Sequence, residues 1–176
     1  MRLQGKQVGM MLGPGFEELE HWVVYMRMKE EGASVSLIGV EAGKTHHGKH
    51  GSLPATAEKA ALDCNASDFD AMLVPGGFAP DKMRRDANLV RLVRETYEQK
   101  KILGLICHAG SMAISAGIIA QGMKATGSLG IKDDLVAAGA DWVDEAAFRE
   151  GPIVWGRHVD DLPAYCRWLV EAIESA

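Results

Sequence analysis

Several features that would assign a protein class at once are missing from this chain of 176 residues. No apolar run approaches the ~20 residues that a membrane-spanning helix needs. The start, MRLQGKQVGMMLG, has no long apolar segment and no cleavage-like site, so we expect no secretory signal. No block of Lys and Arg occurs and the formal net charge is −5, which argues against nucleic-acid binding. We therefore expect neither membrane nor nucleic acid as a partner.

Cysteine is also scarce. The three cysteines, Cys64, Cys107 and Cys166, form no C-x-x-C motif and no even-numbered disulfide framework. This usage predicts a reducing compartment, the cytoplasm. Cys64 stands among polar residues and is expected to be an ordinary turn or surface thiol. Cys166 falls inside a predicted helix, either in the core or on the helix surface.

What the sequence does contain is a regular alternation of strand and helix patterns. Strands are expected at 7–12, 35–40, 71–74, 102–106 and 153–156, and helices at 16–31, 88–99 and 161–174. Between them, residues 41–63 are expected to form a β-hairpin excursion. The alternation predicts a doubly wound α/β fold, with a mainly parallel sheet and helices on both faces. The length favours a single domain over residues 1–176.

The stretch KILGLICHAGSMAISAG, residues 101–117, carries the clearest chemical signal. A buried strand ends at Ile106, Cys107 and His108 follow at once, and a helix-forming segment then runs to Gly117. A strand that turns abruptly into a helix raises the residue at the turn above the sheet edge. The helix N-terminus favours a thiolate there, so we expect Cys107 to be a nucleophile with a depressed pKa, prone to oxidation to a sulfinic acid. The alternative is a small buried apolar residue, the common fate of a free cysteine.

The first turn of the chain, GPGFEE, carries acidic residues where a dinucleotide fingerprint would need a glycine. Two carboxylates at a helix N-terminus would repel a pyrophosphate, so nucleotide binding is not expected. In a doubly wound sheet this turn lies near the end of the strand before Cys107. A carboxyl from it would then approach the thiol, and its pKa would be raised by a neighbouring thiolate. The spacing leaves Glu17, Glu18 and Glu20 open as the group concerned.

Two further turns bear on the site. Pro75-Gly76-Gly77 is either a tight turn that requires glycine or, through the N–H of Gly77 with that of His108, an oxyanion hole. His46, His47 and His50 lie close enough in sequence to be weighed as zinc ligands, but no Cys or acidic residue joins them at ligand spacing. We expect neither a metal nor a cofactor.

Several motifs together resemble the PfpI-type family of the ThiJ/PfpI superfamily. They are FEELE, VPGGFAPDKMR, ICHAG, GIKDDLVAAGADWVDE and DDLPAYCRWL, and the similarity runs from about residue 6 to 173. Proteins of this kind share the class I glutamine amidotransferase-like, flavodoxin-type fold. The chain departs from the family pattern in two places: it reads Cys107-His108-Ala109-Gly110 where C-H-G-P is usual, and Gly156-Arg157 replaces Ser-Arg. Both departures bear on substrate preference.

The resemblance implies a role for each matching residue. Cys107 matches the nucleophile, His108 its adjacent histidine, and Glu17 the glutamate that touches the nucleophile. Gly77 matches the second glycine of the oxyanion turn, with His108 supplying the other amide. Asp81 matches an acidic residue that reaches into the neighbouring subunit's site and orients the histidine. We therefore expect a homodimer or a higher homo-oligomer with intersubunit active sites.

The resemblance also implies the activity. We expect a stress-protective enzyme that acts on reactive carbonyls, either as a glutathione-independent glyoxalase or as a deglycase of glycated proteins and peptides. The alternatives are an intracellular cysteine peptidase and a redox or stress sensor whose Cys107 is oxidised without turnover. Large or inflexible residues expected near the site favour a small aldehyde over a polypeptide; they are Phe16, Phe78, Ala109 and Met112.

Overall fold

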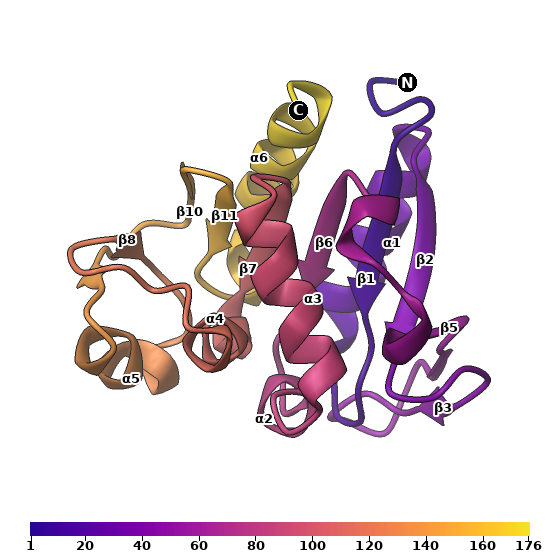
Figure 1. Ribbon diagram of the computed structural model, residues 1–176, viewed down its shortest axis with the longest axis horizontal. Helices are drawn as coiled ribbons and strands as arrows, with labels where there is room; N and C mark the ends of the chain where they lie inside the picture. Colours follow the sequence, from indigo (N-terminus) through magenta and orange to yellow (C-terminus); the bar gives the residue numbers. More distant parts are fainter.

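A seven-stranded sheet forms the centre of the computed structural model, which describes residues 1–176. All neighbouring strands run parallel except the first pair at one edge. In spatial order the strands are β10 (Ala147–Glu150), β11 (Ile153–Gly156), β7 (Ile102–Ile106), β6 (Ala71–Val74), β1 (Gln7–Met11), β2 (Ser34–Gly39) and β5 (Lys59–Ala60). The predicted α/β sheet, mainly parallel, is confirmed (Figure 1).

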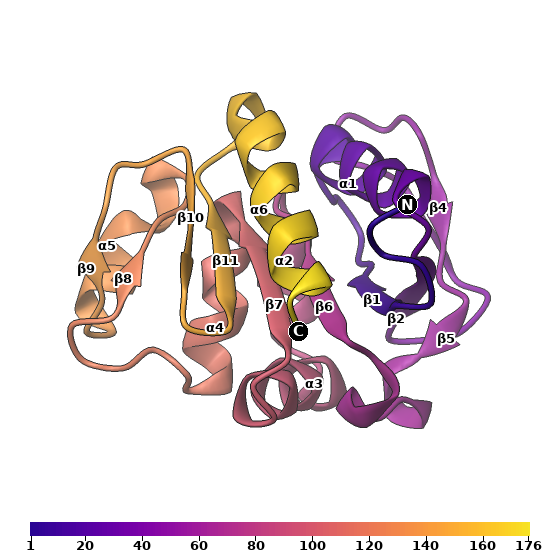
Figure 2. The same ribbon diagram turned by 90° about the horizontal axis from the view of Figure 1, so that it is seen from above.

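Helices cover both faces of this sheet, as a doubly wound fold requires. α1 (Glu18–Glu30) and α6 (Leu162–Glu174) lie together on one face, and α3 (Ala87–Glu98) and α4 (Gly110–Ala116) lie on the other (Figures 1 and 2). The short α2 (Ala79–Met83) packs against α4, and α5 (Lys132–Ala137) lies beyond the β10 edge (Figure 2). No helix combines the length and the apolar character needed to cross a bilayer.

The strand before Cys107 is apolar because it is buried on both faces. Every residue of β7 is buried, and its neighbours β6 and β11 pair with it in parallel register. A Cβ added to Gly104 would lie 2.7 Å from both Leu73 Cδ2 and Tyr165 Oη. The sheet and α6 therefore approach so closely at β7 that only glycine fits there.

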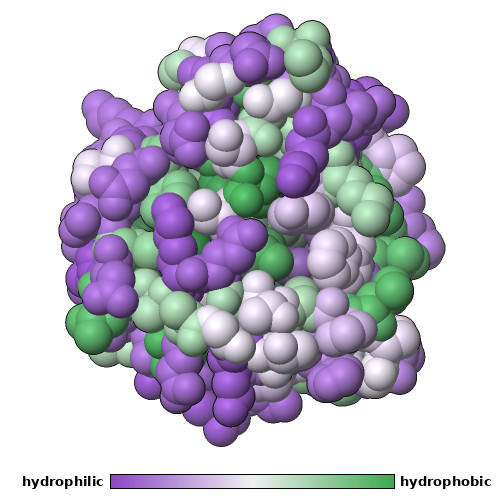
Figure 3. All heavy atoms as spheres, turned by 90° about the vertical axis from the view of Figure 1, so that its right-hand side faces the viewer, coloured by the Kyte–Doolittle hydropathy of each residue, from purple (hydrophilic) through white to green (hydrophobic).

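The expected excursion in residues 41–63 contains an antiparallel pair, β3 (Thr45–His46) with β4 (Ala55–Thr56). Its end then adds β5 to the main sheet. A second small ladder, β8 (Lys124–Ala125) with β9 (Asp141–Trp142), was not predicted. Short 3₁₀ turns occupy Ala61–Asp63, Ala66–Asp68, Cys107–Ala109, Leu129–Ile131 and Val159–Asp161. At the end of the molecule that carries the β3–β4 excursion, hydrophobic side chains lie in small groups among hydrophilic ones (Figure 3).

Cys64 lies at a turn, one of the two positions predicted for it, but its side chain is buried and not on the surface. Arg91 on α3 donates to the Cys64 carbonyl oxygen at 3.0 Å. Burial raises the pKa of the Cys64 thiol. Cys166 is buried in the core, one of the two positions left open for it, and burial raises its pKa to about 11.

One buried histidine stands out on α1. His21 is fully buried, and neither ring nitrogen has a hydrogen-bond partner. Its ring packs 4.7 Å from the Phe16 ring and stacks parallel to the Tyr25 ring at 6.4 Å, measured between centroids. Burial lowers the pKa of His21 to about 4, so the folded protein holds this ring neutral.

Replacing His21 by Phe should make the protein less sensitive to acid. The folded-state pKa of about 4 lies below the ordinary value of about 6.5, so the unfolded chain takes up the proton first as the pH falls below about 6.5. Near pH 4 this difference costs the folded state roughly 3 kcal/mol. The measurement is the free energy of unfolding in urea, for parent and variant, near neutral pH and near pH 4.5.

Comparison with the variant is needed because Glu20 acts in the opposite direction. Burial raises its pKa to about 7, so protonation of Glu20 favours the folded state as the pH falls. Both proteins contain Glu20, so subtracting the free energy of unfolding of one from that of the other at each pH cancels the contribution of Glu20 and leaves that of His21. A difference between parent and His21→Phe that stays constant with pH would contradict the prediction.

Candidate active site

Cys107 lies at the turn between β7 and α4, at the carboxyl edge of the sheet. Its φ is 61°, in the left-handed region that non-glycine residues rarely adopt. The Ser128 N–H donates to the Cys107 carbonyl at 3.1 Å, and a Cβ on Gly127 would lie 2.5 Å from that oxygen. The segment 127–128 thus packs against the Cys107 carbonyl group and fixes the backbone of this turn. The strained backbone raises the thiol above the sheet edge, as the sequence predicts for a nucleophile.

Two backbone amides point at the sulfur. The N–H groups of Gly77 and His108 both hydrogen-bond Cys107 and lower the pKa of its thiol. Gly77 has φ 77°, and an added Cβ would lie 2.5 Å from Glu17 N and 2.6 Å from Gly15 O, so only glycine fits. The structure therefore brings together the two donors predicted for an oxyanion hole.

The carboxyl next to the thiol is that of Glu20, which corrects the assignment of Glu17 to this place. Glu20 accepts the Gly76 N–H through Oε2 at 2.8 Å. A Cβ added to Gly76 would lie 2.5 Å from that oxygen and 3.1 Å from Cys107 Sγ, so the carboxyl and the sulfur face one another across Gly76. Glu17 is instead the N-cap of α1, where its Oε2 accepts the Glu20 N–H at 2.8 Å. Glu18 turns the other way and accepts the His50 N–H at 2.9 Å. The three candidates left open by the spacing thus have three different partners.

The thiol and this carboxyl cannot both be charged at low cost. Burial raises the pKa of Glu20 to about 7, and the Glu17 carboxylate adds to this effect. Burial, and then the negative charge of Glu20, raises the pKa of Cys107 to about 12. The predicted depression of the thiol pKa is therefore wrong, because the N–H groups of Gly77 and His108 act against stronger opposing effects. Near neutral pH the pair therefore favours one negative charge over two, and Glu20 loses its proton before Cys107 does.

His108 lies on the other side of the sulfur. Its Nδ1 is 3.3 Å from Cys107 Sγ, and the side chain is half-buried. Burial, followed by the positive charge of Lys49, lowers the pKa of His108. The imidazole is therefore neutral near pH 7 and can accept or donate one proton at this position.

Asp81 does not reach the histidine within one chain. It lies exposed on α2, where it forms an ion pair with Arg85, and it has no hydrogen bond to His108. Both residues nevertheless line a hollow of about 390 Å³ on the far side of His108 from the thiol pocket. Phe78 and Leu129 are 61% and 77% exposed beside this hollow.

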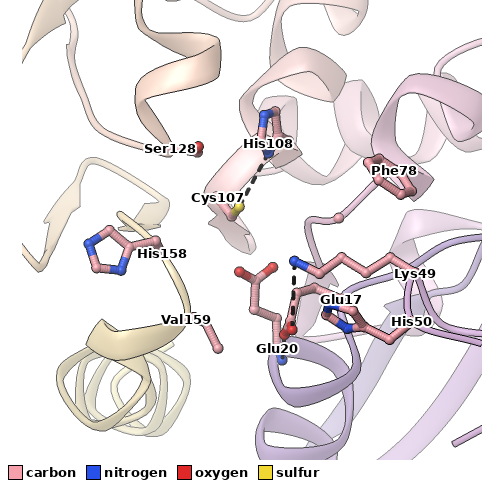
Figure 4. Close-up of a pocket in the computed structure, with 11 residues that line it drawn as sticks. Glu17, Glu20, Lys49, His50, Phe78, Cys107, His108, Ser128, His158 and Val159 are labelled. Carbon is pink, nitrogen blue, oxygen red and sulfur yellow. Dashed lines mark hydrogen bonds and ion pairs between the residues drawn. The ribbon is translucent and has the colours of Figure 1, made fainter. Parts of the chain in front are cut away.

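The thiol opens into a pocket of about 380 Å³ (Figure 4). Its lining comprises Glu17, Glu20, Lys49, His50, Gly77, Phe78, Cys107, His108, Ser128, His158 and Val159. Three residues expected to narrow the cleft, Phe16, Ala109 and Met112, are instead fully buried in the core. No sequence motif marks the lining residues Lys49, Ser128, His158 and Val159, because they come from segments far apart in the chain.

The three histidines considered for zinc are not gathered together. Only His50 joins a group that could hold a metal ion, with Glu17 and Glu18, whose ligand atoms lie within 4.8 Å of one another. Two oxygens of Glu18 already accept hydrogen bonds from the backbone and ring of His50. The donors of this cluster are thus largely used within the protein.

Comparison with known proteins shows which proteins this chain resembles. The chain is 37% identical over 172 residues to general stress protein 18 of Bacillus subtilis, covering 97% of this chain and 99% of the relative. It is 35% identical over 159 residues to deglycase PfpI of Pyrococcus furiosus, covering 90% and 94%. It is 37% identical over 162 residues to the putative cysteine protease YraA of Bacillus subtilis, covering 92% and 95%.

Among solved structures, a two-domain protein of Anabaena variabilis with DJ-1/ThiJ/PfpI-like and ferritin-like domains superposes with a TM-score of 0.92 at 34% identity. The match covers 94% of this chain and 47% of that protein. The sequence model of the DJ-1/PfpI family matches residues 6–172 of this chain. Sequence, fold and the relatives agree, and the chain belongs to the DJ-1/PfpI family.

Proposed function

We propose that this protein is a cysteine-dependent enzyme that acts on small reactive carbonyl compounds, as a glutathione-independent glyoxalase or as a deglycase. One observation carries the proposal: the Cys107 thiol faces the Glu20 carboxyl and the N–H groups of Gly77 and His108, in a pocket of about 380 Å³. These are the parts needed to add a thiol to a carbonyl group and to stabilise the oxygen that becomes charged. The name of the Pyrococcus furiosus relative, a deglycase, supports it.

The chemistry on methylglyoxal follows from these positions. The sulfur bonds to the aldehyde carbon, the C=O π bond breaks, and the thiol proton passes through Glu20 to the oxygen held by Gly77 and His108. A proton then moves from the former aldehyde carbon to the neighbouring ketone carbon, and the hydroxyl proton moves to the former ketone oxygen, giving a lactoyl thioester. Water cleaves the thioester to lactate and the free thiol. With a pKa of about 7, Glu20 can both accept and donate protons near neutral pH.

Peptide hydrolysis is the second candidate, and one observation favours it: a relative of similar identity is named a putative cysteine protease. The same thiol would attack a peptide carbonyl and form an acyl-enzyme. The size of the pocket, about 380 Å³, suits a three-carbon aldehyde better than a folded or extended polypeptide. We therefore place the carbonyl activity first.

We further propose that the active unit is a homo-oligomer in which Asp81 of one subunit orients His108 of another. The support is the hollow that both residues line and the exposure of Phe78 and Leu129 beside it. A neighbouring subunit placed over this hollow would cover both hydrophobic side chains. In that arrangement, Asp81 of the neighbouring subunit would leave its ion pair with Arg85 and bind His108 of the first subunit.

The first test offers methylglyoxal without glutathione and measures lactate. Cys107→Ala should abolish turnover, and Glu20→Gln should lower kcat by about 10²-fold or more, because an amide can no longer move the proton. Glu17→Gln is the comparison variant, since its amide oxygen can still accept the Glu20 N–H. It removes only the charge that adds to the raised pKa of Glu20, so we expect a change below about 10-fold. A fluorogenic peptide panel runs in parallel. Peptide cleavage without lactate formation would replace the carbonyl proposal by the peptidase one.

The second test concerns where the proton resides. Removing the charge of Glu20 removes a cause of the raised thiol pKa. Iodoacetamide should therefore alkylate Cys107 faster in Glu20→Gln than in the parent near pH 7, although the variant converts methylglyoxal more slowly. Peptide mass spectrometry follows each cysteine; the buried Cys64 and Cys166 serve as internal references. Slower alkylation in Glu20→Gln than in the parent would contradict the effect of the Glu20 charge on the thiol.

The third test addresses assembly. Cys107→Ala and Asp81→Ala should each be nearly inactive alone, and mixing them after mild dissociation should restore activity. A mixed dimer contains one site with an intact thiol from the Asp81→Ala subunit and an intact Asp81 from its partner. Arg85→Ala is the control for loss of the ion pair within the chain. Failure of the mixture to regain activity, with mixed species detected by native mass spectrometry, would refute the shared site.

A further inference from the structure

Lys49 lies in the loop between β3 and β4, and that loop is firmly attached to the start of α1. The Lys49 N–H donates to the Phe16 carbonyl at 2.8 Å. The next residue, His50, donates its N–H to Glu18 Oε1 at 2.9 Å, and its ring Nδ1 lies 3.1 Å from Glu18 Oε2. A Cβ on Gly48 would collide with the Glu18 side chain at 2.3 Å. The backbone at Lys49 is therefore fixed from both sides.

The side chain of Lys49 extends along the wall of the thiol pocket, with its ammonium group toward the cavity (Figure 4). The side chain is 30% exposed. Its closest acidic atom is Glu17 Oε1 at 4.0 Å, longer than a hydrogen bond, and the ammonium has no hydrogen-bond partner in the protein. Its charge acts on both Glu20 and His108, which face the thiol from opposite sides. Three donors are thus available to a ligand beside Cys107.

Lys49 is also the one lysine or arginine among the eleven residues that line this pocket. The ring of His50 is engaged by Glu18, and that of His158 lies near Asp160 and Asp161. Two carboxyl groups, Glu17 and Glu20, face the same space. A single ammonium beside two acidic groups matches a monoanion such as a carboxylate better than a doubly charged phosphate.

We propose, resting on the carbonyl activity above, that Lys49 binds the carboxylate of small aldehyde acids, so that 2-oxo acids with a free aldehyde form the adduct with Cys107 in preference to neutral dialdehydes. The carboxylate lies on the Lys49 ammonium and the aldehyde carbon lies at Cys107 Sγ. The S–C bond forms, the C=O π bond breaks, and the thiol proton moves to the oxygen, which the Gly77 and His108 amides hold. The product is a hemithioacetal, and no oxidant or reductant is needed. Lys49 is a specificity-determining residue in this scheme.

The test compares glyoxylate with glyoxal, which differ in that a carboxylate replaces one aldehyde. Each is added at increasing concentration, and the readout is protection of Cys107 from iodoacetamide, which requires adduct formation but no turnover. In the parent protein glyoxylate should protect at lower concentration than glyoxal. Lys49→Met should raise the half-protecting concentration of glyoxylate about 10-fold or more and that of glyoxal by less than about 3-fold.

Two further variants complete the design. Lys49→Arg keeps the charge and should retain most of the preference for glyoxylate. If Lys49→Met folds poorly, Lys49→Arg still tests whether a positive charge at this position carries the preference. Lys44→Met removes a lysine of the same excursion that does not line the pocket and should change neither value. Each variant is judged by the ratio of its half-protecting concentrations for glyoxylate and glyoxal, because this ratio cancels any change in the intrinsic reactivity of the thiol.

The outcomes separate this inference from the function on which it rests. Equal protection by both aldehydes in the parent, or a loss of the same size for both in Lys49→Met, overturns the role of Lys49 and leaves the carbonyl activity standing. Absence of protection by either aldehyde overturns both. A preference for glyoxylate that disappears in Lys49→Met and persists in Lys49→Arg and Lys44→Met establishes it.

Discussion

The contact between the Cys107 thiol and the Glu20 carboxyl is the interaction on which the rest of this site depends. Both groups are acidic and largely buried, so together they favour one negative charge and one proton. The surrounding elements are arranged around that pair. Gly76 donates to the carboxyl, Gly77 and His108 donate to the sulfur, and Glu17 fixes the helix turn that carries Glu20. Each of these partners comes from the carboxyl edge of a parallel strand or from the first turn of the following helix.

Much of the fold could be predicted from the sequence, because its main signals are local. The predicted bounds of β6, β7 and β11 agree with the structure, since a strand buried on both faces is a continuous apolar run between turn residues. The helix predicted at 16–31 begins later, at Glu18, because Phe16 forms a bridge to Gly77 and Glu17 is the cap. The β8–β9 ladder was not foreseen. Its strands have two residues each, too few for any period to be visible, and they depend on tertiary contacts.

The site was predictable where one segment determines it and not where several meet. The strand, the cysteine and the following helix lie within one stretch, so the positions of Cys107 and of the His108 amide followed from it. The second donor, Gly77, was predicted separately from the Pro75-Gly76-Gly77 turn. The choice between Glu17 and Glu20 depends on where helix α1 begins and on which way its first turn faces, and those are set by packing against the Gly76 turn. Lys49 and His158 come from loops more than 100 residues apart, and no motif links them to the thiol. The pKa of Cys107 was misjudged for a related reason: helix position is visible in the sequence, whereas burial is not.

The dispersion of the pocket along the chain has a consequence for the newly made protein. Its walls include residues near 17–20, 49–50, 77–78, 107–108 and 158–159, so the pocket is incomplete until the last strand, β11, has joined β7. Before that moment Cys107 is an ordinary thiol, with a pKa near 8.5 and ready access to oxidants. Once the sheet closes, burial and the negative charge of Glu20 raise the pKa of the thiol. Completion of folding thus withdraws the cysteine from general thiol chemistry and restricts its reactions to molecules that fit the pocket.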